Sequence, residues 1–134
     1  MTAGTNKPRI VLADDHQLML DKIAHLLQRD FEIVAIVQTG RMAVQAVTEL
    51  KPDVVVLDIA MPELGGIEAA REIRKIGSSA RIVFLSIQDD PEYIEAASAM
   101  GIGYVLKSRM RSDLAEAIRE ALAGRLFVSD SRAS

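Results

Sequence analysis

Short apolar runs alternate along this chain with longer segments in which apolar residues recur every three or four positions. The runs cover residues 9–13, 32–37, 53–57, 80–85 and 103–106. Because several of them are apolar at nearly every position, they are typical of strands that helices cover on both faces. The intervening segments predict helices that begin near Gln17, Arg41, Ile67, Pro91 and Ser112. The alternation therefore favours an α/β fold with a mostly parallel sheet.

The last of these helices has the clearest pattern, and the fourth has the weakest. The apolar stripe of the last helix consists of Leu114, Ile118, Ala121 and Leu122. Ser112 is a candidate N-cap for this helix, and Gly124 is a residue that can end it. The fourth helix starts well at Pro91 but has only alanines and one methionine for its stripe. We therefore expect the fourth helix to be thinly anchored and able to move.

The first helix has more leucines than its buried face needs. We interpret Met19, Ile23, Leu26 and Leu27 as the stripe that faces the core. Leu20 then lies roughly a quarter-turn from the centre of this stripe and is expected to be partly exposed. An exposed leucine at this place is a candidate contact in a homodimer.

The composition fits a single globular domain. The chain has 134 residues, 49% of them hydrophobic, which is enough for one sizeable core. Its net charge of −3 and its pI of 5.4 predict no broad basic face, so we do not expect the chain itself to bind DNA. Because it has no cysteine, it has neither disulfides nor thiolate metal sites, which fits a reducing compartment.

The ends of the chain predict neither secretion nor a membrane partner. No apolar stretch approaches the ~18 to 20 residues that span a bilayer, and the polar start of the chain lacks an apolar signal-peptide centre. We therefore interpret the protein as cytoplasmic. Residues 1–7 are expected to form a disordered N-terminal tail, residues 8–127 the folded domain, and residues 128–134 a C-terminal tail or linker.

Residues suited to phosphate chemistry follow four of the apolar runs. Asp14 and Asp15 follow the first run, Asp58 the third, Ser86 the fourth and Lys107 the fifth. The carboxyl ends of parallel strands meet at one edge of the sheet, where open α/β sheets place their ligand sites. The sequence therefore predicts that carboxylates, a hydroxyl and an ammonium gather at this edge.

The order of these residues resembles the receiver domain of two-component response regulators. The matching positions are Asp14-Asp15, Asp58 with Met61-Pro62 and Gly66, Ser86, and Tyr104-x-x-Lys107. The resemblance covers nearly the whole chain and implies a flavodoxin-like (CheY-like) fold. Such a fold is a doubly wound sheet of five parallel strands, in the order 2-1-3-4-5, with five helices. The motif Asp14-Asp15-His16 and the pair Lys107-Ser108 are similar to the receivers of LuxR/NarL-type transcription factors.

The resemblance also implies a role for each site residue. Asp58 is the expected phosphoacceptor, which takes a phosphoryl group from a sensor histidine kinase or from a small phosphodonor such as acetyl phosphate. Ser86 and Lys107 complete the catalytic set, because their hydroxyl and ammonium bind the phosphoryl oxygens. A Mg²⁺ or Mn²⁺ ion is expected on Asp14, Asp15, Asp58 and the backbone carbonyl of Ala60. His16 lacks a second histidine at ligand spacing, so we interpret it as a helix-start residue.

The same resemblance implies a mechanical response. Once Asp58 is phosphorylated, Ser86 moves toward the new oxygens and makes space for the ring of Tyr104. The surface formed by the fourth helix, the fifth strand and the fifth helix then changes and carries the output. The implied function is a phosphorylation-dependent signalling switch in the control of transcription.

Nothing after Arg125 resembles the helix-turn-helix domain that LuxR-type factors carry. One interpretation is an excised receiver, which contacts DNA only through an absent C-terminal domain and whose residues 128–134 begin the linker. The other interpretation is a stand-alone receiver that acts by contact with other proteins.

Two other classes with a similar sheet fit the residues less well. A haloacid-dehalogenase-type phosphohydrolase has an acid two positions after its nucleophile, where this chain has Ala60. A flavodoxin-like cofactor binder needs a phosphate-binding loop after the first strand, where Asp14 and Asp15 would repel phosphate. Because neither Ala60 nor Gln88 offers a general base, we expect a phosphoacceptor with slow hydrolysis rather than an enzyme.

Overall fold

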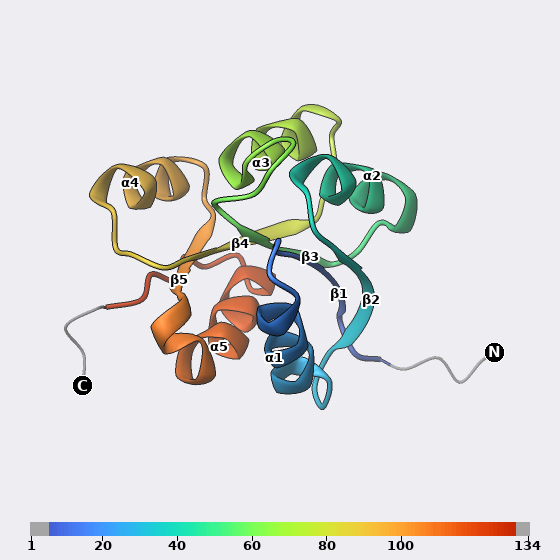
Figure 1. The fold of residues 1–134 in the computed structure, drawn as a ribbon, viewed down its shortest axis with the longest axis horizontal. Helices are drawn as coiled ribbons and strands as arrows, with labels where there is room; N and C mark the ends of the chain where they lie inside the picture. Colours follow the sequence, from blue (N-terminus) through green and yellow to red (C-terminus); the bar gives the residue numbers. More distant parts are fainter. Residues whose placement is uncertain (1–5, 131–134) are drawn as a thin grey trace.

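The computed structural model describes residues 6–130, in which strands and helices alternate (Figure 1). The strands are β1 (Arg9–Ala13), β2 (Glu32–Val37), β3 (Val54–Asp58), β4 (Arg81–Ser86) and β5 (Gly103–Leu106). The helices are α1 (Gln17–Leu27), α2 (Gly40–Leu50), α3 (Gly66–Lys75), α4 (Pro91–Ala99) and α5 (Met110–Leu122), and a short 3-10 helix, η1 (Lys107–Arg109), precedes α5. No helix in the described range is long and apolar enough to cross a membrane. Residues 1–5 of the expected N-terminal tail and residues 131–134 lie outside the described residues.

The strands form one parallel sheet in the order β2-β1-β3-β4-β5, which confirms the predicted fold class. Figure 1 shows α1 and α5 on one face of the sheet and α2, α3 and α4 on the other. The chain passes from β1 outward to β2 and then returns past β1 to β3, so the direction of winding reverses between β1 and β3. In an open parallel sheet, the loops beyond such a reversal form the ligand site.

Alternate side chains of the central strand β3 pack into two separate cores. Val55 and Leu57 belong to the core between the sheet and α2, α3 and α4, whereas Val54 and Val56 belong to the core on the side of α1 and α5. Because successive residues of a strand point to opposite faces, a strand between two helical layers must be apolar throughout. This packing explains the uninterrupted apolar runs, and it holds β3 firmly behind its last residue, Asp58.

The buried stripe of α1 differs from the expected one. Leu20 is completely buried together with Ile23 and Leu27, whereas Leu18 is 78% exposed. Positions 20, 23 and 27 are three and four residues apart, so they form one line along the helix that faces the sheet. The prediction is confirmed for Ile23 and Leu27 and was wrong for Leu20, while Met19 and Leu26 are only partly buried. The dimer contact suggested for Leu20 loses its basis.

Helix α5 begins at Met110, because η1 runs directly into it. Ser112 lies in the first turn of α5, where its one hydroxyl proton is shared between the carbonyl of Arg109 (3.1 Å) and Oδ1 of Asp113 (2.9 Å). The assignment of Ser112 as the N-cap was therefore wrong. The other end of the helix follows expectation: Gly124 ends it with a φ of 77°, a left-handed conformation that glycine adopts without strain.

Helix α4 has little packing, as the sequence predicts. Ala97 is the one buried residue among its nine. Its first turn is stabilised locally, because Pro91 starts the helix and the Asp90 carboxylate accepts the backbone N–H of Glu92 at 2.9 Å. This helix therefore depends more on its cap than on the core.

Beyond α5 the chain returns to the sheet and lies along the free edge of β5. The amide of Tyr104 donates to the carbonyl of Phe127 (2.9 Å), and the amide of Ser129 donates to the carbonyl of Tyr104 (2.8 Å). Val128 lies between these two bonds and forms an isolated bridge with Tyr104. Val128 and Ser129, which belong to the segment that we interpreted as a tail or linker, therefore lie against β5.

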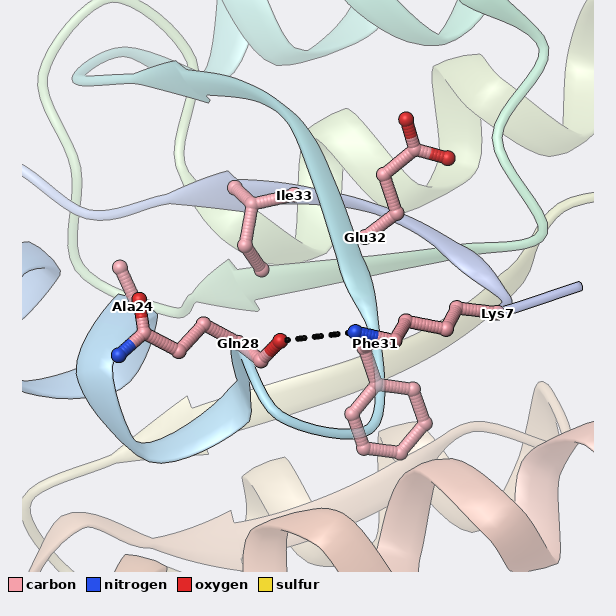
Figure 2. A pocket seen from close by; sticks show the side chains of 6 residues that line it. All are labelled: Lys7, Ala24, Gln28, Phe31, Glu32 and Ile33. Atoms are coloured by element: carbon pink, nitrogen blue, oxygen red, sulfur yellow. Dashed lines mark hydrogen bonds between the residues drawn. The ribbon is translucent and has the colours of Figure 1, made fainter. Parts of the chain in front are cut away.

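At the amino ends of β1 and β2, Lys7 lies beside the turn that follows α1. Figure 2 shows its side chain reaching the backbone carbonyl of Gln28, 3.5 Å away. Phe31 and Ile33 line the same pocket. This pocket lies at the opposite end of the strands from the predicted site, and no predicted site residue lines it.

Candidate functional site

The predicted site residues meet at the carboxyl edge of the sheet. Asp58 is the last residue of β3, Asp14 directly follows β1, and Lys107 begins the turn after β5. Ala13 of β1 pairs with Leu57 of the neighbouring strand β3, so the next residues, Asp14 and Asp58, lie side by side. Oxygens of Asp14, Asp15 and Asp58 lie within 4.8 Å of one another.

One lysine bridges two of these carboxylates. The Nζ of Lys107 lies 2.8 Å from Oδ2 of Asp14 and 3.3 Å from Oδ2 of Asp58. The Asp14 side chain is completely buried, and the side chains of Asp58 and Lys107 are 5% and 9% exposed. With Asp15 beside them, three carboxylates face one ammonium, so the cluster carries an excess of negative charge.

Burial and crowding make Asp58 a weaker acid than a free aspartate. Burial raises the pKa of Asp58, and the charge of Asp14 raises it further, while Lys107 and the N–H of Ala60 lower it without compensating. Burial alone would lower the pKa of Lys107, but its hydrogen bond to Asp14 and the charge of Asp58 outweigh burial and raise this pKa. The Lys107 ammonium therefore stays charged. The positive charge around Asp58 is too small to offset the burial of its ionised carboxylate and the repulsion from Asp14.

The oxygen donors around Asp58 suit a hard divalent cation. Asp14, Asp15 and Asp58 supply carboxylate oxygens within reach of one ion. The backbone of Ala60 is held beside them, because its N–H donates to Oδ1 of Asp58 at 3.2 Å. Mg²⁺ and Mn²⁺ prefer such oxygen ligands and retain several waters. The residues present therefore fit the ion that the sequence predicts.

His16 lies at the rim of this cluster. It is the N-cap residue of α1, as expected for a helix-start residue, and its side chain is 72% exposed. Its Nδ1 lies 3.0 Å from Oδ1 of Asp15. Its backbone N–H donates to Oδ1 of Asp14 at 2.9 Å, so the backbone of His16 helps to fix the buried carboxylate.

Ser86 and Tyr104 are joined through the backbone of Gln88. The Gln88 carbonyl accepts hydrogen bonds from the Ser86 hydroxyl (2.9 Å) and from the Tyr104 hydroxyl (2.7 Å). The Tyr104 side chain is completely buried, and this burial raises the pKa of its hydroxyl. Both candidate switch residues thus share one carbonyl in the loop between β4 and α4. Sequence reasoning missed this role of Gln88, because a backbone carbonyl leaves no trace in the pattern of side chains.

Ser86 lines the same cleft as Asp58, although its hydroxyl bonds to Gln88. This cleft has a volume of about 210 Å³ and is also lined by Tyr93 and Lys107. The carboxylate, the hydroxyl and the ammonium that the sequence predicts therefore border one space.

Gly66 allows the loop after β3 to pack closely behind the site. A β-carbon at this position would lie 2.4 Å from the backbone carbonyl oxygen of Asp58. The amide of Gly66 donates to the carbonyl of Ile59 at 2.8 Å, which closes the loop. Glycine is therefore required here by the close approach of α3 to the end of β3.

A family model and many curated proteins match most of the chain. The model of the response regulator receiver domain matches residues 10–119. The chain is 35% identical over 126 residues to the transcriptional regulatory protein DegU of Brevibacillus brevis, covering 92% of this chain and 53% of that protein. It is 34% identical over 129 residues to a nitrate/nitrite response regulator homologue of Haemophilus influenzae, covering 94% and 62%. The chain thus spans about half to three-fifths of the length of these relatives.

Solved structures share the fold over nearly the whole chain. The signal receiver domain of the response regulator NarL from Mycobacterium tuberculosis superposes with a TM-score of 0.84 at 26% identity, covering 90% of this chain and 100% of that one. A LuxR-family two-component response regulator from Aurantimonas sp. SI85-9A1 gives a TM-score of 0.85 at 34% identity, covering 91% and 89%.

Proposed function

Since the chain belongs to the response regulator receiver domain family, with relatives of the LuxR/NarL type, we propose that it is a phosphorylation-dependent signalling switch. Asp58 is the phosphoacceptor, and a sensor histidine kinase or acetyl phosphate supplies the phosphoryl group. The observation that carries the proposal is the buried ion pair in which Lys107 bridges Asp14 and Asp58. An ammonium held there against two carboxylates is placed to pair with an oxygen of a phosphoryl group on Asp58.

In the transfer step, a carboxylate oxygen of Asp58 attacks phosphorus while the bond from phosphorus to the donor breaks. With acetyl phosphate the leaving group is acetate, so charge is conserved. The Lys107 ammonium and the Ser86 hydroxyl bind oxygens of the transferred group. Asp14, Asp15, Asp58 and the Ala60 carbonyl would hold a Mg²⁺ or Mn²⁺ ion, which would supply positive charge against the phosphoryl oxygens.

The response begins at the Gln88 carbonyl. When the Ser86 hydroxyl turns toward a phosphoryl oxygen, this carbonyl loses one of its two hydroxyl donors and keeps Tyr104. The loop between β4 and α4 then repositions, and the surface of α4, β5 and α5 changes with it. Because the Tyr104 ring is already buried, the switch needs a change of hydrogen-bond partners rather than a long movement of the ring.

The site is suited to retaining its phosphoryl group. The position two residues after Asp58 is Ala60, which offers no side chain that could take a proton from an attacking water. Gln88, in the loop after β4, is likewise no general base. We therefore propose slow autodephosphorylation and no turnover as a phosphohydrolase.

The output is control of transcription through a separate DNA-binding domain. The matched relatives include proteins named transcriptional regulators, which are longer than the part that this chain covers. The net charge of −3 gives the chain itself no basis for DNA contact. The alternative is a stand-alone receiver that acts by protein contact, including a homodimer. A cytoplasmic location fits both.

Incubation with acetyl phosphate and Mg²⁺, followed by measurement of the intact mass, tests the phosphoacceptor. We expect the wild-type protein to gain the mass of one phosphoryl group and the Asp58→Asn variant to gain none. Asp21→Asn, which changes an exposed carboxylate on α1, is the matched control and should gain as much as the wild type. No gain in the wild type, or an equal gain in Asp58→Asn, would overturn the proposal.

A further inference from the structure

Residues 127–129, named here the C-terminal strap, are attached to β5 by a buried hydroxyl as well as by backbone bonds. The Ser129 hydroxyl accepts the amide N–H of Leu106 (3.1 Å) and donates to Oδ2 of Asp113 (2.7 Å). Ser129 and Asp113 are each only 6% exposed. One side chain thus joins the strap to the end of β5 and to the first turn of α5.

The Asp113 carboxylate, which accepts this bond, is held by two further hydrogen-bond donors. It also accepts the Nε–H of Arg109 (3.0 Å) and the Ser112 hydroxyl (2.9 Å). Burial alone would raise the pKa of Asp113, but the hydrogen bonds from Ser129, Ser112 and Arg109 outweigh it and lower this pKa. The buried carboxylate is therefore ionised, and the bond from Ser129 is charge-assisted, which makes it stronger than a bond between neutral groups.

The strap meets the candidate switch at Tyr104. The amide and carbonyl of Tyr104 both bond to the strap, through Phe127 and Ser129. The side-chain hydroxyl of the same residue bonds to Gln88 in the loop between β4 and α4. One residue therefore connects the loop that follows Ser86 to the segment that leads out of the domain.

We propose that the C-terminal strap is a regulatory connection, anchored at Asp113 and responsive at Tyr104, which passes the state of the Asp58 site to the C-terminal end of the chain. Its input rests on the proposed function, whereas its attachment to β5 does not. While it is attached, the strap also occupies the free edge of β5, so no other strand can pair there. A shift of Tyr104 loosens the strap and changes how the following chain is held.

Amide hydrogen exchange, measured by NMR on the full chain, tests the attachment. We expect the amides of Tyr104, Leu106 and Ser129 to be protected in the wild type. Ser129→Ala removes the hydroxyl and should speed exchange of the Leu106 amide about tenfold. Ser79→Ala, which changes an exposed serine in the loop before β4, is the control and should leave these amides unchanged. Unprotected Tyr104, Leu106 and Ser129 amides in the wild type, or equal effects of the two variants on Leu106, would overturn the proposed attachment of the strap to β5.

The connection to the site has its own test. Phosphorylation with acetyl phosphate and Mg²⁺ should change exchange of the Tyr104 and Ser129 amides in the wild type but not in Asp58→Asn. Tyr104→Phe breaks the bond to Gln88 and should shift the Ser129 amide without any phosphorylation.

The outcomes separate the two proposals. If phosphorylation changes the Gln88 amide and leaves the strap amides as they were, the connection is overturned and the proposed function stands. If the wild type takes up no phosphoryl group, the proposed function fails, and Tyr104→Phe alone decides the connection. If the strap amides of Tyr104→Phe exchange at the wild-type rate, the connection between the site and the strap is overturned.

Discussion

Helices α4 and α5 flank the same strand, β5, but they are held in different ways (Figure 1). Helix α5 buries Asp113, Leu114, Ala117 and Ile118, whereas α4 buries Ala97 alone. Helix α4 relies on a side-chain cap from Asp90, while α5 has no side-chain cap and enters directly from η1. The surface proposed to carry the output therefore has one firmly packed side and one weakly packed side.

This difference indicates which part of the surface can move at a small cost in free energy. A helix with one buried residue exposes little apolar area when it shifts, whereas a shift of α5 would expose several apolar side chains to water. The loop that follows Ser86 and contains Gln88 leads into α4 and not into α5. We therefore expect α4 to move and α5, with the anchored end of the C-terminal strap, to stay in place.

The largest expected effect compares truncations in the two helices. Leu114→Ala should lower the free energy of unfolding by about 2–5 kcal/mol, because Leu114 is completely buried. Ile94→Ala in α4 should cost about 1 kcal/mol, because Ile94 is only partly buried. Urea unfolding of both variants measures the difference. Equal losses would remove the distinction between a firm and a weak side.

The next effect concerns the cap of α4. Asp90→Ala removes the acceptor for the Glu92 amide and should cost about 1 kcal/mol, seen as faster amide exchange throughout α4. Thr39→Ala is the matched control, since the Thr39 hydroxyl caps α2 in the same way and accepts the Met42 amide at 3.0 Å. Because α2 buries four residues, the rest of that helix should stay protected. Similar exchange in both helices would contradict the comparison.

A smaller effect concerns the hydroxyl that links β5 to the loop before α4. Tyr104→Phe keeps the buried ring but removes the bond to the Gln88 carbonyl, so it should destabilise the fold by about 0.5–1.5 kcal/mol. Tyr93→Phe, at a position 36% exposed, should leave the urea midpoint nearly unchanged. Amide exchange in Tyr104→Phe should rise in α4 before it rises in α5. The reverse order would show that α5 is the movable side.

The smallest effect is a pH dependence at the site itself. Because the folded protein raises the pKa of Asp58, the ionised carboxylate costs stability above that pKa, and the cost vanishes below the unfolded pKa of about 3.9. Asp58→Asn should therefore unfold at a higher urea concentration than the wild type at pH 7. This gain should shrink as the pH falls into the acid range. Asp21→Asn should show no such gain, and a gain that grows in acid would contradict the assignment.

The positions of the site residues were predictable because they depend on where strands end. Asp14, Asp58 and Lys107 each follow an apolar run, and a parallel sheet must bring such positions to one edge. Because neighbouring strands pair in register, the side chains at their carboxyl ends lie beside one another. The contact distances confirm that these three residues meet.

The errors arose where several arrangements satisfy the same sequence pattern. The leucines of α1 allow two adjacent stripes, and only packing against the sheet selects the one that buries Leu20. Ser112 is a good N-cap by residue type, but η1 continues the chain into α5 and moves the start of the helix to Met110. Local preference was overruled in both cases by the way the neighbouring segment approaches.

By itself, the sequence determined the order of strands and helices, the two-sided burial of the sheet and the set of groups at its carboxyl edge. The physical reason is that the alternation of strands and helices and the position of each strand end depend on neighbouring residues and not on distant parts of the chain. Only the tertiary structure decided that Lys107 bridges two carboxylates, that Gln88 offers one carbonyl to Ser86 and Tyr104, and that Ser129 attaches the strap to Asp113. Apart from the bond between Ser86 and Gln88, which are two residues apart, these contacts join groups that are distant in the chain, and proximity in the folded state selects their partners.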